Sequence, residues 1–83
     1  MRISYFAWVR ERMGIAEETL ELPQAVATVR DLVSWLAARD ARGARAFAEP
    51  GKIRAALGGA MVGPDAAIGD AEEVALFPPV TGG

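Results

Sequence analysis

The residues whose chemistry is most informative are the last four, Val80-Thr81-Gly82-Gly83. Neither Gly82 nor Gly83 has a Cβ, so the backbone and its terminal carboxylate can enter a channel too narrow for any other residue. Pro78-Pro79 stands directly before them, and proline fixes φ and favours an extended path. Fully extended, four residues reach roughly 13 Å. The sequence therefore predicts a flexible tail over residues 80–83 that presents its carboxyl group to another protein.

A terminal carboxylate is ionised at neutral pH and is a weak nucleophile, so another protein must activate it. Attack of the carboxylate on the α-phosphate of ATP would give an acyl-adenylate. A sulfur donor would convert that adenylate to a thiocarboxylate, whereas an amine would convert it to an amide. The first outcome would make the chain a sulfur carrier and the second a protein modifier, and the residues alone leave both open.

The composition argues against a resident catalytic centre. The 83 residues include no cysteine and no histidine, which removes the commonest nucleophile, general base and metal ligands. The 11 Asp and Glu residues are scattered and form no motif for a metal ion or an acid/base pair. We therefore expect no bound cofactor or metal, and no catalysis by this chain alone.

The charge and the hydropathy of the sequence argue against nucleic acid and membranes as partners. The net charge is −2 and the nine Lys and Arg residues are dispersed, so there is no basic stripe for a nucleic-acid backbone. No segment approaches the ~20 apolar residues of a membrane span, and residues 1–4 do not have the form of a signal peptide. We expect a cytoplasmic protein that binds neither nucleic acid nor membrane.

The order of patterns along the chain predicts an α+β fold of the β-grasp (ubiquitin-like) type over residues 1–79. Alternation and turn residues predict strands, and apolar residues at helical spacing after Thr28 predict the main helix. The expected strands are 2–9, 17–22, 52–57, 60–62 and 73–77. A short, charged helical turn is expected at 10–13, ending at Gly14, with the main helix at 28–39 and a smaller helical piece at 41–48. A mixed sheet of about five strands with the main helix on one face accounts for this order.

The uncovered face of that sheet is the candidate docking surface. If Val74 and Leu76 point toward the helix, Phe77 points away from it, and the same alternation turns Phe6 outward from the first strand. The first and last strands are neighbours in a β-grasp sheet, and Met61 lies on the hairpin beside them. Exposed aromatic clusters mark interfaces, so we predict a docking patch of Phe6, Met61 and Phe77. The alternative is that the two faces are exchanged and these residues belong to the core.

Three stretches of sequence resemble the MoaD family, the small sulfur-carrying subunits of molybdopterin synthase. The stretches are Tyr5-Phe6-Ala7 followed by Val9-Arg10-Glu11, the helix start Thr28-Val29-Arg30-Asp31-Leu32, and above all residues 70–83, which read DAEEVALFPPVTGG. The resemblance covers the whole chain, and the last stretch is the most specific. One departure is Gly58-Gly59, where many relatives have a polar residue at the hairpin.

The resemblance implies a cycle of loading and delivery. An ATP-dependent adenylating enzyme (MoeB-like) activates Gly83, sulfur replaces one oxygen, and Gly82 lets the loaded tail thread into the large synthase subunit (MoaE-like). The sulfur then goes to cyclic pyranopterin monophosphate during molybdenum cofactor biosynthesis, within a heterotetramer that contains two large subunits. The implied contact residues are the docking patch and the segment that follows it: Phe6, Met61, Phe77, Pro78, Pro79, Val80 and Thr81.

Three other interpretations share the fold. A sulfur carrier of another pathway, such as thiamin thiazole synthesis, also ends in two glycines but usually lacks the Phe-Pro-Pro of residues 77–79. A ubiquitin-like protein modifier would join Gly83 to lysines of other proteins. A passive β-grasp interaction module would be indifferent to deletion of Gly82 and Gly83.

Overall fold

The computed structural model describes residues 1–79, so the predicted tail, residues 80–83, lies outside the described residues. The described part contains strands, α-helices and one short 3-10 helix. In chain order they are β1 Arg2–Tyr5, α1 Ala7–Met13, β2 Glu17–Thr19, α2 Val29–Arg39, α3 Ala41–Ala46, η1 Pro50–Lys52, β3 Arg54–Leu57, β4 Ala60–Val62 and β5 Glu73–Phe77.

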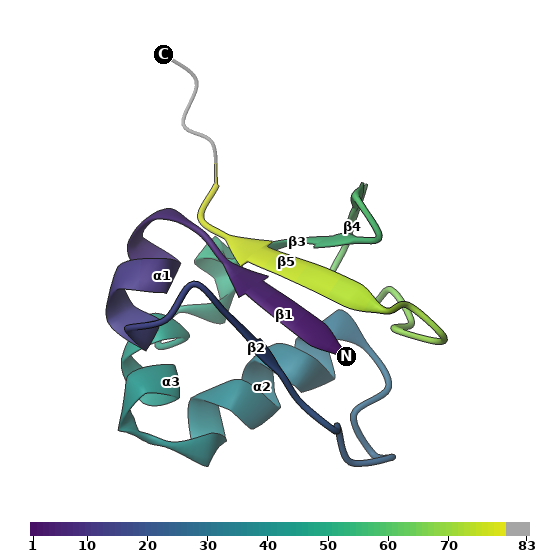
Figure 1. The fold of residues 1–83 in the computed structure, drawn as a ribbon, viewed down its shortest axis with the longest axis horizontal. Coiled ribbons are helices and arrows are strands. Elements are labelled where there is room, and N and C mark those ends of the chain that lie inside the picture. The colour runs from purple at the N-terminus through teal and green to yellow at the C-terminus, as the bar shows by residue number, and fades with distance from the viewer. Residues whose placement is uncertain (80–83) are drawn as a thin grey trace.

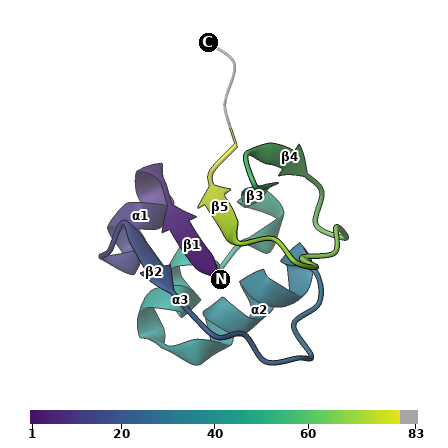
Figure 2. The ribbon, with the colours of Figure 1, turned by 45° about the vertical axis from the view of Figure 1, so that its right-hand side comes forward.

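The strands form one mixed sheet in the order β2-β1-β5-β3-β4. The central pair, β1 and β5, is parallel, and the other neighbouring pairs are antiparallel. The helices pack against one face of the sheet and leave the other face uncovered (Figures 1 and 2). This arrangement confirms the predicted β-grasp fold, with the first and last strands side by side.

Helix α2 forms where the sequence predicts it because both its cap and its apolar stripe are in place. The Thr28 side chain accepts a hydrogen bond from the Asp31 backbone N–H, and the Asp31 carboxylate accepts one from the Thr28 backbone N–H. This reciprocal capping box satisfies two donors at the start of the helix. Leu32 and Leu36, four positions apart, are fully buried against the sheet.

The first strand is shorter than the sequence pattern predicts. It ends at Tyr5, and Trp8 and Val9 belong to helix α1 instead of the strand. Val9 and Met13 are fully buried at a spacing of four, the helical period. Ala7, predicted to face the core, is exposed and has φ +52°, a left-handed conformation that turns the chain out of the sheet. The predicted strand over residues 2–9 is therefore wrong beyond Tyr5.

The smaller helical piece is α3, and it packs very closely on α2. A Cβ on Gly43 would lie 1.8 Å from the backbone oxygen of Leu36, so only glycine fits at that crossing. The approach brings Phe47, at the end of α3, into the core, where its ring tilts against the ring of Tyr5 at a centroid distance of 6.4 Å. The predicted burial of Phe47 is confirmed. The helix layer thus contains the main helix α2, the predicted smaller piece α3 and helix α1.

The β3–β4 hairpin turns at Gly58-Gly59, as predicted. Both glycines have positive φ, 54° and 86°, which a side chain disfavours. Strand β2 is shorter than the predicted 17–22 and ends at Thr19, although backbone hydrogen bonds join Met1 and Leu20 just beyond it.

A half-buried polar network ties strands β1 and β2 to the end of α2. Arg39 donates two hydrogen bonds to the Glu18 carboxylate, at 3.1 and 2.8 Å, and the Tyr5 hydroxyl donates a third at 2.6 Å. Burial opposes ionisation of Glu18, but the hydrogen bonds from Arg39 and Tyr5 outweigh it and lower the pKa of that carboxyl. Burial, together with the negative Glu18, raises the pKa of Tyr5 well above its usual value.

Candidate partner-docking site

The uncovered face of the sheet has a floor of small side chains. Strand pairing places Ser4, Ala75, Ala56 and Met61 in one row across β1, β5, β3 and β4. Their neighbours along β5, Val74 and Leu76, are buried under the helices at 1% and 0% exposure. The predicted assignment of the two faces is therefore confirmed, and the alternative with exchanged faces is wrong.

Phe6 lies at the end of this face, but it is not a strand residue. It is the N-cap of α1, with extended φ and ψ of −128° and 156° and no side-chain capping bond. Its backbone N–H still donates to the Leu76 oxygen at 3.1 Å, and its own oxygen accepts from Val9 N–H. These bonds fix Phe6 beside the end of β5, and its side chain is 50% exposed.

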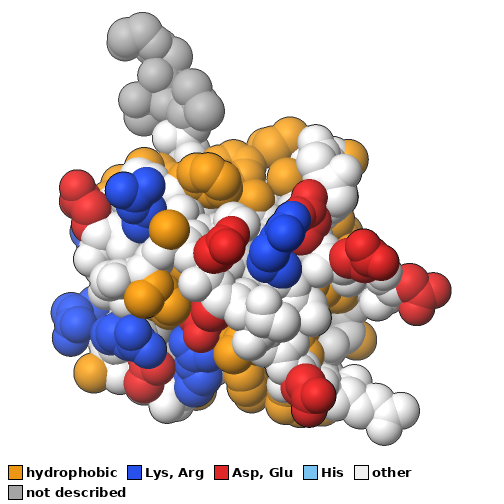
Figure 3. All heavy atoms as spheres, in the orientation of Figure 1, with side chains coloured by type: hydrophobic (Ala, Val, Ile, Leu, Met, Phe, Trp, Pro, Cys, Tyr) orange, Lys and Arg blue, Asp and Glu red, His pale blue; other side chains and the backbone are white. Residues whose placement is uncertain are grey.

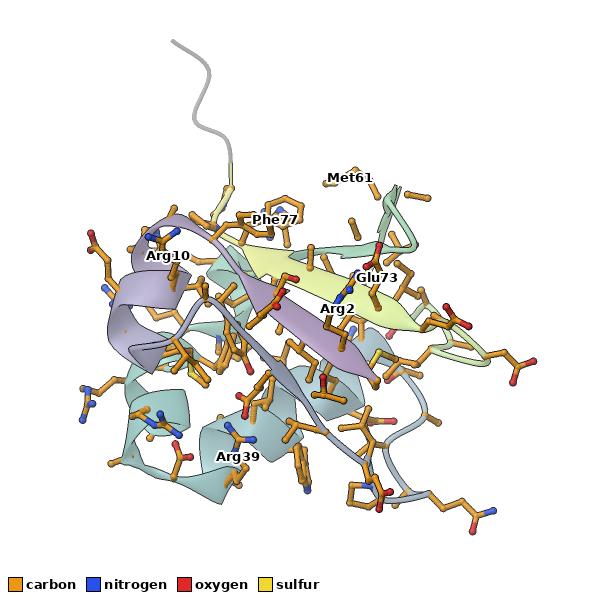
Figure 4. The ribbon with its side chains drawn as sticks, in the orientation of Figure 1. Arg2, Arg10, Arg39, Met61, Glu73 and Phe77 are labelled. Atoms are coloured by element: carbon orange, nitrogen blue, oxygen red, sulfur yellow. The ribbon has the colours of Figure 1, made fainter. Side chains whose placement is uncertain are left out.

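Met61 and Phe77 occupy the same face. Met61 is 65% exposed on the edge strand β4, the largest exposure among the big hydrophobic residues of the described part of the chain. Phe77, predicted to be exposed, is half-buried at the last position of β5, followed by half-buried Pro78 and Pro79. Hydrophobic atoms gather over the C-terminal end of β5 and over the hairpin (Figure 3). The labelled side chains of Met61 and Phe77 lie in the same region (Figure 4).

We call Phe6, Met61 and Phe77 the docking patch. Met61 is level with Ala75 in the register, two residues before Phe77, and Phe6 follows β1 and is bonded to Leu76. The remaining predicted contact residues, Val80, Thr81, Gly82 and Gly83, lie outside the described residues. The patch is an apolar surface of the kind that excludes water at an interface.

Charged residues surround the patch unevenly. At the start of β1 and β5, Arg2 and Glu73 are paired across the strands and form an ion pair. At the other end of the face, Arg54 is directly opposite Phe77 in the β3–β5 register, and Arg10 lies on α1 one turn beyond Phe6. Both of these arginines are exposed.

Neither a metal site nor a membrane span is found in the described part. Residues 1–79 contain no group of three or more acidic, His or Cys side chains able to hold a metal ion. Within the same range, none of the helices has the length and apolar character needed to cross a bilayer.

Sequence reasoning missed two features of this site. It did not identify the floor formed by Ser4, Ala75 and Ala56, although small residues at alternate positions were visible in the strands. It also did not identify Arg54, because its position beside Phe77 depends on the register between two strands far apart in sequence.

The ThiS family model matches residues 3–83, a range that includes the Gly82-Gly83 pair and nearly the whole chain. The chain therefore belongs to the ThiS family.

Two curated relatives are more specific. A protein of Escherichia coli (strain K12) named "Molybdopterin synthase sulfur carrier subunit" is 40% identical over 83 residues, which is 100% of this chain and 99% of that protein. A protein of the same name from Haemophilus influenzae is 31% identical, with the same coverage of both chains. The resemblance to sulfur carrier subunits stated from the sequence is thereby confirmed.

Solved structures agree on the fold. A protein of Pyrococcus furiosus described as "Putative molybdopterin converting factor, subunit 1" has a TM-score of 0.73 and 32% identity, covering 95% of each chain. SAMP1 from Haloferax volcanii has a TM-score of 0.71 and 25% identity, covering 100% of this chain and 98% of that one.

Proposed function

We propose that this chain is the sulfur carrier subunit of a molybdopterin synthase and acts in molybdenum cofactor biosynthesis. The observation that carries the proposal is the full-length similarity, at 40% identity, to a protein of that name. The absence of cysteine and histidine from the sequence supports a carrier over an independent enzyme, because the commonest nucleophile and general base are missing.

The proposed loading reaction uses the Gly83 carboxylate and two external reagents. A carboxylate oxygen attacks the α-phosphorus of ATP on the adenylating enzyme, pyrophosphate leaves, and an acyl-adenylate forms. A sulfur nucleophile then attacks the acyl carbon and AMP leaves, which gives the thiocarboxylate. ATP is thus used by the activating enzyme and is not a cofactor bound by this chain.

The proposed delivery reaction takes place inside the large subunit. The docking patch binds that subunit, Pro78 and Pro79 direct the chain outward, and residues 80–83 thread into its active site. The thiocarboxylate sulfur goes to cyclic pyranopterin monophosphate, and water restores the Gly83 carboxylate. Two transfers supply the two sulfurs of the dithiolene, which fits a cytoplasmic heterotetramer with two small and two large subunits.

Docking must supply most of the affinity, because an ordered tail is costly. Fixing the backbone of one residue costs about 1–2 kcal/mol, so threading four residues costs on the order of 4–8 kcal/mol. The exposed surfaces of Phe6 and Met61 are suited to offset this cost, since their burial removes apolar area from water without the need to order a loop.

A sulfur-transfer assay tests the proposal. Chain loaded with thiocarboxylate is mixed with the large subunit of the same organism and cyclic pyranopterin monophosphate, and molybdopterin is measured. The proposal predicts product with the loaded chain and none with a chain lacking Gly83. If the loaded chain binds the large subunit but yields no product, while it supports thiazole formation with thiamin enzymes, the chain is a carrier of the other pathway. Formation of amide bonds to lysines, in place of sulfur transfer, would identify a modifier.

A further inference from the structure

We propose that Arg54, with Arg10, forms a cationic border to the docking patch and binds carboxylates on the surface of the partner protein. This inference rests on the proposed function, because it describes the chemistry of the partner that covers the patch. The proposal predicts that the partner has an apolar pocket for the docking patch, with acidic side chains beside that pocket.

The two arginines stand on either side of the aromatic pair. Arg54 is directly opposite Phe77 in the β3–β5 register, so both lie on the uncovered face of the sheet. Arg10 is four residues after Phe6, and its backbone N–H donates to the Phe6 oxygen, which puts the two on adjacent turns of one helix face. Figure 4 shows Arg10 and Phe77 at the same end of the molecule.

The guanidinium of Arg54 is held in place and keeps one edge available. Its Nη1 donates to the backbone oxygens of Gly51 at 2.8 Å and Ile53 at 3.1 Å. A guanidinium has five N–H donors, so the edge formed by Nε and Nη2 remains, and that edge can hold a carboxylate through two parallel hydrogen bonds. Because the group is already oriented, little side-chain entropy is lost when the carboxylate binds.

Neither arginine is neutralised by a carboxylate of the described residues. Within residues 1–79, acidic side chains lie within ion-pair distance of Arg2, Arg30, Arg39, Arg42 and Lys52, but of neither Arg10 nor Arg54. The two exposed cations at the tail end therefore contrast with the Arg2–Glu73 ion pair at the opposite end of the same face.

The net charge of the chain is −2, so attraction toward an acidic partner must come from local groups of cations and not from the overall charge.

Association kinetics with the large subunit test the proposal. The double variant Arg10→Gln/Arg54→Gln should lower the association rate about tenfold at low ionic strength and flatten its dependence on salt. Arg54→Lys keeps the charge but loses the two-pronged geometry, so it should retain the association rate and dissociate faster than the wild type. Arg12→Gln/Arg45→Gln, an equal loss of two charges at exposed positions on α1 and α3, is the matched control and should change neither rate.

The outcomes separate this inference from the proposed function. If the wild-type chain binds the large subunit with rates that respond to neither arginine nor salt, the cationic border is refuted and the docking patch stands. If Arg54→Lys dissociates like the wild type, the bidentate contact is refuted. If the wild-type chain does not bind the large subunit at all, the proposed function itself fails.

Discussion

Replacement of Phe6 by alanine measures what the docking patch contributes to partner binding. An aromatic side chain buries 150–250 Å² when fully covered, and Phe6 is 50% exposed, so about 100 Å² remains for a partner to cover. At about 25 cal/mol per Å² this area is worth up to about 2.5 kcal/mol, which corresponds to a loss of affinity of roughly 70-fold. We expect Phe6→Ala to weaken binding of the large subunit by a factor of this order.

The assay is calorimetric titration of the large subunit at fixed salt, paired with urea unfolding of each variant. The half of Phe6 that the fold covers predicts a loss of unfolding free energy of up to about 2.5 kcal/mol, which leaves a domain of ordinary stability folded. Leu22→Ala is the control. It removes a half-buried apolar side chain beside Met1, at the start of β1, and because β1 and β5 are parallel this is the opposite end of the sheet from Phe77.

A folded Phe6→Ala variant that binds within about threefold of the wild type would refute the patch as an energetic centre of the interface. A Leu22→Ala variant that loses as much affinity would show that binding responds to general loosening of the fold. Equal binding by wild type and Leu22→Ala, with a large loss for Phe6→Ala, is the expected result.

Three further predictions concern the stability of the fold that positions the patch. Gly43→Ala should lower the unfolding free energy in urea titrations by about 1–3 kcal/mol or more, because its Cβ would overlap the Leu36 carbonyl. Gly51→Ala, which has open space around it, should cost little. Equal effects of the two substitutions would contradict the close crossing of α2 and α3. Since the folded pKa of Glu18 is below its ordinary value of 4.5, the stabilisation from this group is present above that pH and is lost as pH falls through the lowered pKa. Glu18→Gln should abolish this part of the acid loss. Since the folded pKa of Tyr5 is raised, stability should also fall as pH rises above the ordinary tyrosine pKa of 10.0, and an unchanged alkaline profile in Tyr5→Phe would contradict that assignment.

Local signals were sufficient to predict much of the fold. The N-cap of α2 and its apolar spacing, the paired glycines of the hairpin, and the alternation in β5 each act within a few residues. For these segments the local preference and the tertiary environment agree, so the pattern alone was reliable.

The start of α1 could not be predicted from the same kind of signal. Tyr5, Val9 and Met13 are each four positions apart, a spacing that satisfies both strand alternation and a helical face. The conformation of Ala7 decides between strand and helix. A positive φ in alanine is disfavoured locally, so no local signal indicates the turn.

The composition of the docking surface was only partly predictable. The outward direction of Phe6 and Met61 was predicted correctly, although Phe6 reaches that position as a helix cap. The half-burial of Phe77 and its pairing with Arg54 depend on register between distant strands, which period-two alternation does not specify.

The central claim is that the terminal carboxylate of Gly83 carries sulfur. Its most direct test is the intact mass of the protein after incubation with ATP, a sulfur source and the adenylating enzyme of the same organism. We predict a mass gain that matches replacement of one oxygen by one sulfur, confined to the C-terminal peptide and absent from a variant that lacks Gly83. An unchanged mass, with an adenylating enzyme shown to be active on ATP, would contradict the carrier function.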